Sequence, residues 1–322
     1  MINLINVTKR YDNEVAVESL SMHINKGELC VLAGESGCGK STTLRMINRL
    51  IKYDEGKIEI DGKDITSYKE EELRRGIGYV IQNVGLFPHM NVRDNISVVP
   101  RLLKQDEGKI LKRVKELIDM VGMKVDDYIN KFPDQLSGGE AQRIGVARAL
   151  AADPEIILMD EPFGAVDPIN RLNLQDQFLA IQKELKKTVV FVTHDLEEVI
   201  KMGDKVAIMS KGVLQCFDTP KNILKKGNDF TKDFMGSESY IDLLSKYPIA
   251  KHINISDKTE HKFSVSIAQN AKEVLSAMIS TGENILSVKD EKGNIFKVLK
   301  DKENYKMILD FNNTLYAIML AL

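Results

Sequence analysis

The stretch GESGCGKS, from Gly34 to Ser41, has the residue types and spacing of a phosphate-binding loop. Its glycines let the backbone turn tightly, so that N–H groups converge on phosphate oxygens, and the N-terminus of a following helix adds a partial positive charge. Lys40 is placed to reach the outer phosphates of a nucleotide, and Ser41 to bind Mg²⁺. The alternative is a glycine-rich turn that fits the pattern by chance. The correctly placed Lys-Ser pair and the further motifs disfavour it.

Two acidic residues end the apolar run IILMDEP, from Ile156 to Pro162. An acid at the C-terminal end of a buried strand points into the crevice where open α/β sheets bind their ligands. Asp160 is the candidate partner of Mg²⁺, through water, and Glu161 is the candidate base that polarises the attacking water. For this pair taken alone, acids at a solvated strand end are the alternative interpretation.

Three further residues could contact a nucleotide. His194 ends the apolar run TVVFVTHD and is the candidate γ-phosphate sensor, although a lone histidine is more often a structural hydrogen bonder. Gln82, at the end of another apolar run, could contact both the metal and the water without adding charge. Tyr11 could stack on adenine, with a core or surface filler as the alternative.

A second glycine-rich stretch, LSGGEAQR from Leu136 to Arg143, places Ser137 and backbone N–H groups at the start of an expected helix. A predicted helical insertion should hold this stretch too far from Lys40 to reach the same phosphate within one chain. A second copy related by a two-fold axis can bring it there, so each nucleotide would lie between two subunits. An ordinary N-cap explains the serine but not the paired glycines with Glu140 and Gln142.

Short apolar runs alternate with amphipathic ones in the first part of the chain, which predicts an α/β fold. A strand at 28–33 should lead through the phosphate loop into a helix, and KIEIDGKDIT from Lys57 should form a hairpin around its Asp-Gly turn. A helical subdomain should span about 88–151, followed by buried strands at IILMD and TVVFV. We expect a first domain at 1–236 and a small α/β domain at 237–322, made of a strand, a helix and two strands.

The composition excludes several classes of protein. With 45 Lys+Arg against 47 Asp+Glu, the net charge of -2 leaves no electrostatic footprint for nucleic acid. The 3 cysteines form no CxxC pair, which indicates free thiols in a reducing compartment. The N-terminus does not resemble a secretory signal, and the apolar runs are far shorter than the roughly 20 residues that span a bilayer. We therefore expect that this chain does not cross a membrane by itself.

Taken together, the motifs resemble the ATP-binding subunit of ABC transporters, over roughly residues 1–236. Tyr11 matches the A-loop, GESGCGKS the Walker A motif, Gln82 the Q-loop, LSGGE the signature, IILMDEP the Walker B motif, Asp167 the D-loop and His194 the switch histidine. The resemblance implies ATP and Mg²⁺ as ligands, a P-loop NTPase fold, Glu161, His194 and Gln82 as catalytic residues, and Ser41, Gln82 and Asp160 at the metal. The nucleotide-binding residues that it implies are Tyr11, Gly34, Glu35, Ser36, Gly37, Cys38, Gly39, Lys40, Ser41, Thr42, Ser137, Gly138, Gly139, Glu140 and Asp167.

The resemblance also implies partners. Family members form a head-to-tail dimer, here a homodimer, on the cytoplasmic face of the inner membrane, beneath two permease subunits. ATP binding closes the dimer, hydrolysis reopens it, and the movement reaches the transmembrane gate through a groove near Gln82. A solute-binding protein would be an indirect partner, and nucleic acid would not be one.

Finer features resemble the importers of osmoprotectants such as glycine betaine, choline, carnitine and proline betaine. QNVGLFPHMNVRDNISVVPRLL and EPFGAVDPINR are close to that branch, whose members often carry a C-terminal extension of paired CBS motifs. Residues 237–322 resemble one divergent CBS motif, with Lys297, Lys300 and Glu303 where the motif commonly has a glycine and a Ser/Thr-x-x-Asp ligand set. A sensing role and a dimerisation role are both open for this segment.

Other functions share parts of this pattern. An ATPase subunit for another solute, such as an amino acid, would carry the same catalytic motifs. A soluble ABC ATPase would usually carry a second cassette or a long coiled-coil insertion, and the sequence shows neither. A P-loop kinase would lack LSGGE and His194.

Overall fold

The computed structural model describes residues 1–12, 14–82, 85–164, 166, 168–226, 228–236, 244–246, 264–266, 268–281, 287–289 and 295–297. The chain separates into two compact units. The first comprises Met1–Asp195 and Met202–Asp218, and the second comprises Leu196–Lys201 and Thr219–Leu322. The domain boundary expected at residue 236 stays a prediction.

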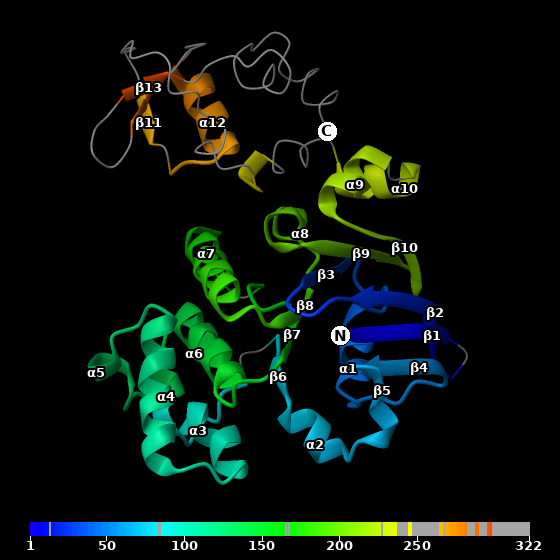
Figure 1. Ribbon diagram of the computed structural model, residues 1–322, viewed down its shortest axis with the longest axis vertical. Helices are drawn as coiled ribbons and strands as arrows, with labels where there is room; N and C mark the ends of the chain where they lie inside the picture. The colour runs from blue at the N-terminus through cyan, green and yellow to red at the C-terminus, as the bar shows by residue number, and fades with distance from the viewer. Residues whose placement is uncertain are drawn as a thin grey trace. The chain divides into compact units, whose positions relative to one another are not determined.

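A six-stranded sheet with the order β10-β9-β3-β8-β7-β6 forms the centre of the first unit (Figure 1). Its strands are β3 (Leu29–Gly34), β6 (Ile77–Val80), β7 (Ile156–Asp160), β8 (Thr188–Val192), β9 (Lys205–Ser210) and β10 (Val213–Asp218). All neighbours pair in parallel except β10, which is antiparallel to β9. Every residue of β3, β7 and β8 is buried, as in parallel sheets covered on both faces. The carboxyl ends of the parallel strands therefore meet at one edge, where open α/β sheets bind ligands.

A second, four-stranded antiparallel sheet has the order β2-β1-β4-β5. Its strands are β1 (Ile2–Tyr11), β2 (Glu14–Ile24), β4 (Glu55–Ile60) and β5 (Lys63–Asp64). The predicted hairpin is confirmed, since β4 and β5 pair across a two-residue turn. Asp61 and Gly62 have φ of 51° and 74° in this turn, and the Asp-Gly sequence favours such positive values.

Helices separate β6 from β7 in the sequence. They are α3 (Val92–Leu102), α4 (Glu107–Met120), α5 (Val125–Tyr128) and α6 (Gly138–Leu150), and α3 packs against both α4 and α6. In α4 the buried residues are Ile110, Val114, Leu117 and Ile118, whose spacing places them on one helical face. The remaining helices of this unit are α1 (Lys40–Ile47), α2 (Glu70–Arg75), α7 (Pro168–Leu185) and the short 3-10 helices η1 (Ile65–Ser67) and η2 (Pro133–Gln135).

The second unit contains Leu196–Lys201 of α8 (Leu196–Met202), then α9 (Pro220–Lys226), α10 (Asp229–Met235), η3 (Leu244–Lys246) and α12 (Ala271–Thr281). Its sheet has the order β11-β12-β13 and comprises β11 (Ser264–Ser266), β12 (Ser287–Lys289) and β13 (Ile295–Lys297). The order strand, helix, strand, strand agrees with the expected α/β segment. Lys297 lies in β13, whereas Lys300 and Glu303 lie outside the described residues. Among the described helices, none has the length and apolar character needed to cross a membrane.

Candidate active site

The loop between β3 and α1 has a backbone that only glycine can adopt at two points. Gly34 and Gly39 have φ of 146° and 103°. A Cβ on Gly34 would lie 2.2 Å from the backbone oxygen of Met209, and one on Gly39 would lie 2.5 Å from that of Ala16. Glycine at both positions lets the loop lie directly against the backbone of Met209 and Ala16. A loop this tight can direct several N–H groups toward one phosphate.

Lys40 fills the inside of this loop. Its side chain is 6% exposed, and Nζ donates hydrogen bonds of 2.7 Å to the backbone oxygens of both Gly34 and Glu35. Nζ also lies 3.7 Å from Sγ of Cys38. Burial raises the pKa of the Cys38 thiol, and the neighbouring Lys40 ammonium opposes that rise. The loop thus holds one buried positive charge at the point where its N–H groups would meet an anion.

A hydroxyl and a carboxylate meet beside the loop. Oγ of Ser41, in the first turn of α1, donates to Oδ1 of Asp160 at a distance of 2.8 Å. Asp160 is the last residue of β7 and is 5% exposed. The structure therefore brings together two of the three residues predicted to lie at the metal.

The three predicted catalytic side chains meet at the carboxyl edge of the sheet. Glu161 follows β7, Gln82 follows β6 and His194 follows β8, and these are adjacent strands. Nε2 of Gln82 donates to Oε2 of Glu161 at 2.8 Å, and Nδ1 of His194 lies 3.2 Å from Oε1 of the same carboxylate. Glu161 has a φ of 45°, in the left-handed region that a non-glycine residue adopts at a cost in free energy.

The second glycine-rich stretch forms the N-terminus of α6. Oγ of Ser137 accepts a hydrogen bond from the Glu140 N–H at 3.3 Å, and the Ser137 N–H donates to Oε2 of Glu140 at 2.7 Å. The Tyr128 hydroxyl donates a hydrogen bond to the same carboxylate. This hydrogen bond and the one from the Ser137 N–H lower the pKa of Glu140. Ser137, Gly138, Gly139 and Glu140 border a surface hollow of about 640 Å³. In the part of the chain that the structure describes, no hydrogen bond or ion pair joins Ser137–Glu140 to the phosphate loop.

The roles of all these site residues stay predictions, and two further predicted residues remain to be placed. Tyr11 lies at the end of β1 with 45% of its surface exposed, and Nζ of Lys9 is 5.1 Å from its ring centroid. Asp167 lies outside the described residues.

Comparison with known proteins identifies the family. Residues 17–164 match the family model described as ABC transporter. The carnitine transport ATP-binding protein OpuCA of Listeria monocytogenes serotype 1/2a (strain 10403S) is 45% identical over 305 residues, which cover 94% of this chain and 75% of that protein. The chain belongs to the family of ABC transporter ATP-binding proteins. It is an ATP-binding cassette that hydrolyses ATP.

Two further comparisons extend this result. The glycine betaine/carnitine/choline transport ATP-binding protein OpuCA of Bacillus subtilis (strain 168) is 50% identical over 243 residues, which cover 75% of this chain and 64% of that protein. The solved dimeric structure of MJ0796, a bacterial ABC transporter cassette, has 34% sequence identity and a TM-score of 0.62, and the match covers 68% of this chain and 98% of MJ0796. The cassette fold predicted from the sequence is confirmed.

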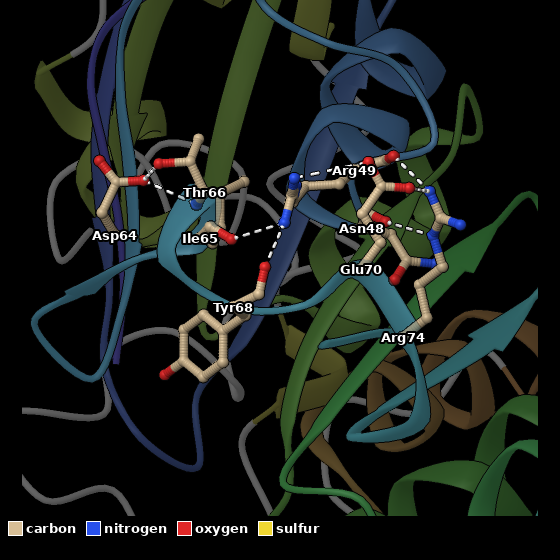
Figure 2. Close-up of polar contacts among 8 residues, drawn as sticks. All are labelled: Asn48, Arg49, Asp64, Ile65, Thr66, Tyr68, Glu70 and Arg74. Atoms are coloured by element: carbon tan, nitrogen blue, oxygen red, sulfur yellow. Dashed lines mark hydrogen bonds and ion pairs between the residues drawn. The ribbon is translucent and has the colours of Figure 1, made fainter. Parts of the chain in front are cut away.

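Arg74 of α2 holds the far end of the cassette's phosphate-loop helix α1 (Figure 2). Nη2 of Arg74 donates to the backbone oxygen of Arg49 at 2.7 Å, and Nε donates to that of Asn48 at 3.4 Å. Nη2 also lies 2.9 Å from Oε2 of Glu70. A positive charge at a helix C-terminus is favourable because the last carbonyl groups carry a partial negative charge.

Arg49 continues this network into the next segment (Figure 2). It follows α1 with a φ of 50° and donates through Nη1 to the backbone oxygens of Ile65 at 3.1 Å and Tyr68 at 2.7 Å. The network therefore ties α1 to η1 and α2. It fixes the helix whose first two residues are Lys40 and Ser41.

Replacing Arg74 with methionine should lower the free energy of unfolding by about 1–2 kcal/mol, because two backbone oxygens lose a charged donor. Arg75→Met is the matched control, since Arg75 lies on the same helix and pairs only with Glu71, at 3.3 Å, among the contacts described. That pair is exposed, so the control should change stability by less than about 0.5 kcal/mol. Urea denaturation of the full chain, followed by circular dichroism, measures both variants. Equal losses would contradict the capping role of Arg74.

Sequence reasoning missed Tyr128, Arg49 and Arg74, which contact functional segments without belonging to any motif. Arg74 is 25 positions from the backbone oxygen of Arg49 that it contacts, and Tyr128 is 12 positions from Glu140. A surface arginine and a surface tyrosine carry no signal of such a partner in the sequence. Only the fold brings these groups together.

Proposed function

We propose that this chain is the ATP-hydrolysing subunit of an importer of quaternary-amine osmoprotectants such as glycine betaine, choline or carnitine. The observation that carries the proposal is the 45% identity over 94% of the chain to a protein named for carnitine transport. The Bacillus subtilis relative, named for glycine betaine, carnitine and choline, supports the same class of solute. An importer of another solute, such as an amino acid, would share the catalytic residues and is the second candidate.

The residues beside the phosphate loop fit Mg²⁺. Ser41 Oγ and Asp160 Oδ1, 2.8 Å apart, are the hard oxygen donors that this cation prefers. The described residues contain no group of three or more His, Cys, Asp or Glu side chains that could hold a metal alone. A Mg²⁺ ion held by few protein groups would take its other ligands from nucleotide phosphates and water. When bound, Mg²⁺ would neutralise negative charge on the phosphate oxygens. The residues that would hold it are Ser41, Gln82 and Asp160.

Hydrolysis would then be divided among the described side chains. Lys40 would exchange the two backbone oxygens that it now contacts for oxygens of the β- and γ-phosphates. Water would attack the γ-phosphorus and break its bond to the β–γ bridging oxygen, giving ADP and phosphate. Glu161 would accept the proton of that water, because its carboxylate oxygens keep free lone pairs beside their contacts with Gln82 and His194. His194 would then contact the γ-phosphate.

A second copy of the chain would complete the site. Ser137 and the N–H groups of Gly138 and Gly139 lie at the N-terminus of α6, which favours an anion, yet they make no described contact with the phosphate loop of their own chain. In a head-to-tail homodimer this stretch would face the ATP held by the partner's phosphate loop. The dimeric structure of MJ0796 supports an assembly of two cassettes.

The permease would dock on the same unit. A cavity of about 310 Å³ is lined by residues that include Tyr79 and Gly85, on either side of Gln82 in the sequence, together with Arg74, Phe87 and Arg148. Arg148 donates to the backbone oxygen of Gly85 at 2.7 Å, so a segment seated there would contact the loop that carries Gln82. The subunit would thus lie on the cytoplasmic face of the inner membrane, with a solute-binding protein as an indirect partner. The CBS-like role of the C-terminal segment stays a prediction.

Uptake of labelled solute tests the proposal. Cells that lack the gene for this chain should lose uptake of labelled glycine betaine, choline or carnitine at high osmolarity. The unmodified gene should restore the uptake, and the gene with Glu161→Gln should not. Unchanged uptake of all three solutes in the deletion strain would contradict the osmoprotectant assignment. Loss of labelled amino-acid uptake instead would favour the second candidate.

A further inference from the structure

One arginine joins the loops that follow two neighbouring strands. Arg171, in the first turn of α7, places Nη1 3.2 Å from Oδ2 of Asp195, and its Nη2 donates to the backbone oxygen of Val166 at 3.1 Å. Val166 belongs to the loop after β7, and Asp195 to the loop after β8. The side chains of Arg171 and Asp195 are only 27% and 30% exposed, so solvent weakens this pair less than it weakens a pair at the open surface.

Both loops carry residues of the reaction centre. Asp195 directly follows His194, whose Nδ1 lies 3.2 Å from Oε1 of Glu161. The Asp195 N–H also donates to Oγ1 of Thr193 at 3.0 Å, so both the side chain and the backbone of Asp195 are held. A shift of Asp195 would therefore move the backbone of His194 relative to Glu161.

The planar shape of the guanidinium group explains why arginine suits position 171. Its two terminal nitrogens point to a carboxylate on one loop and a carbonyl on the other, at a fixed mutual angle. A lysine has one charged nitrogen on a flexible chain and cannot hold both acceptors in that geometry. Nε of Arg171 is buried and has no hydrogen-bond partner within the described residues, so the orientation of the side chain depends on the two terminal contacts.

We infer that Arg171 is a positioning residue for ATP hydrolysis, which holds His194 against Glu161 by bracing the loops after β7 and β8 through Asp195 and Val166. The inference rests on the roles proposed above for Glu161 and His194. Arg171 itself contacts neither of them in any described interaction. Its effect is therefore on the geometry of the reaction centre and not on the phosphate loop that binds ATP.

Steady-state ATPase kinetics of the full chain test this inference. Arg171→Met should lower kcat by about 10- to 100-fold, because small displacements of catalytic groups have effects of this size, and should leave KM for ATP within about twofold. Compared with Arg171→Met, Arg171→Lys should recover only part of kcat, since lysine restores the positive charge but not the two terminal nitrogens of the guanidinium. Asp195→Asn should resemble Arg171→Met. A wild-type kcat in Arg171→Met, in an assay where Glu161→Gln is inactive, would overturn the inference and leave the proposed function standing.

Two comparisons separate positioning from general stability. Arg101→Met is the matched control, because the guanidinium of Arg101 also contacts two acceptors, Asp94 at 3.0 Å and Glu107 at 2.9 Å. Arg101 lies in α3, however, and not beside the strand ends that carry the reaction centre. It should lower the melting temperature without lowering kcat. In a His194→Ala background, Arg171→Met should cause no further loss of kcat. A further loss equal to that in the unmodified chain would overturn the route through His194. If Arg171→Met fails to fold, Asp195→Asn provides the same two tests.

Discussion

Replacing Glu161 with glutamine is expected to lower the steady-state rate of ATP hydrolysis by about 10²- to 10⁴-fold, because an amide cannot accept the proton of the attacking water. ATP binding should stay within a few-fold of the unmodified chain, since the phosphate loop is unchanged. The variant should also keep the local geometry. The glutamine oxygen can accept from Gln82, and its NH₂ group can donate to Nδ1 of a neutral His194, in place of the 2.8 Å and 3.2 Å contacts of the carboxylate.

Glu155→Gln is the control for this measurement. Glu155 directly precedes β7, whereas Glu161 directly follows it, and the Glu155 carboxylate pairs with Lys26 at 2.9 Å on the exposed surface. Removing that charge should leave turnover unchanged, because no group of the site contacts Glu155 in the described interactions. Near-normal hydrolysis by Glu161→Gln would refute the assignment of Glu161 as the base.

The position of a candidate residue can be predicted from the sequence where its motif follows a buried strand, although its role at the site stays a prediction. Gln82, Glu161 and His194 each follow an apolar run, and parallel strands bring such positions to one edge of a sheet. What the sequence did not show was that β6, β7 and β8 are immediate neighbours. Because the strands are adjacent, Gln82 and His194 can contact the two different oxygens of the Glu161 carboxylate.

The four-stranded sheet is harder to predict for a physical reason. The pairing of β1 with β2 shifts register between Leu4 and Val7 and again between Val7 and Lys9. Asn6 in β1 and Ser19 in β2 have positive φ, at 48° and 45°. Each irregularity breaks the alternation of buried and exposed residues that marks a strand in a sequence. The positive φ of Glu161 is equally invisible, because tertiary contacts impose it on a residue that does not favour it.

Replacing Ser137 with arginine is expected to abolish ATP-driven dimerisation while leaving nucleotide binding by the single chain largely intact. Ser137 is exposed and borders the hollow of about 640 Å³ at the N-terminus of α6, so the larger side chain has room in the separate chain. In a dimer that traps ATP against this helix, the same side chain would occupy the space of the partner's γ-phosphate. Static light scattering with ATP, in the Glu161→Gln background that prevents hydrolysis, measures the result.

Ser137→Ala separates the steric block from the loss of the helix cap. Both substitutions remove the oxygen that accepts from the Glu140 N–H, and both should therefore destabilise α6 by about 0.5–2 kcal/mol. Only arginine adds bulk at the proposed interface, so the alanine variant should still dimerise at saturating ATP. Since the phosphate loop of each chain is intact in both variants, a stable ATP-bound dimer of Ser137→Arg would mean that this face of α6 does not meet the partner's nucleotide.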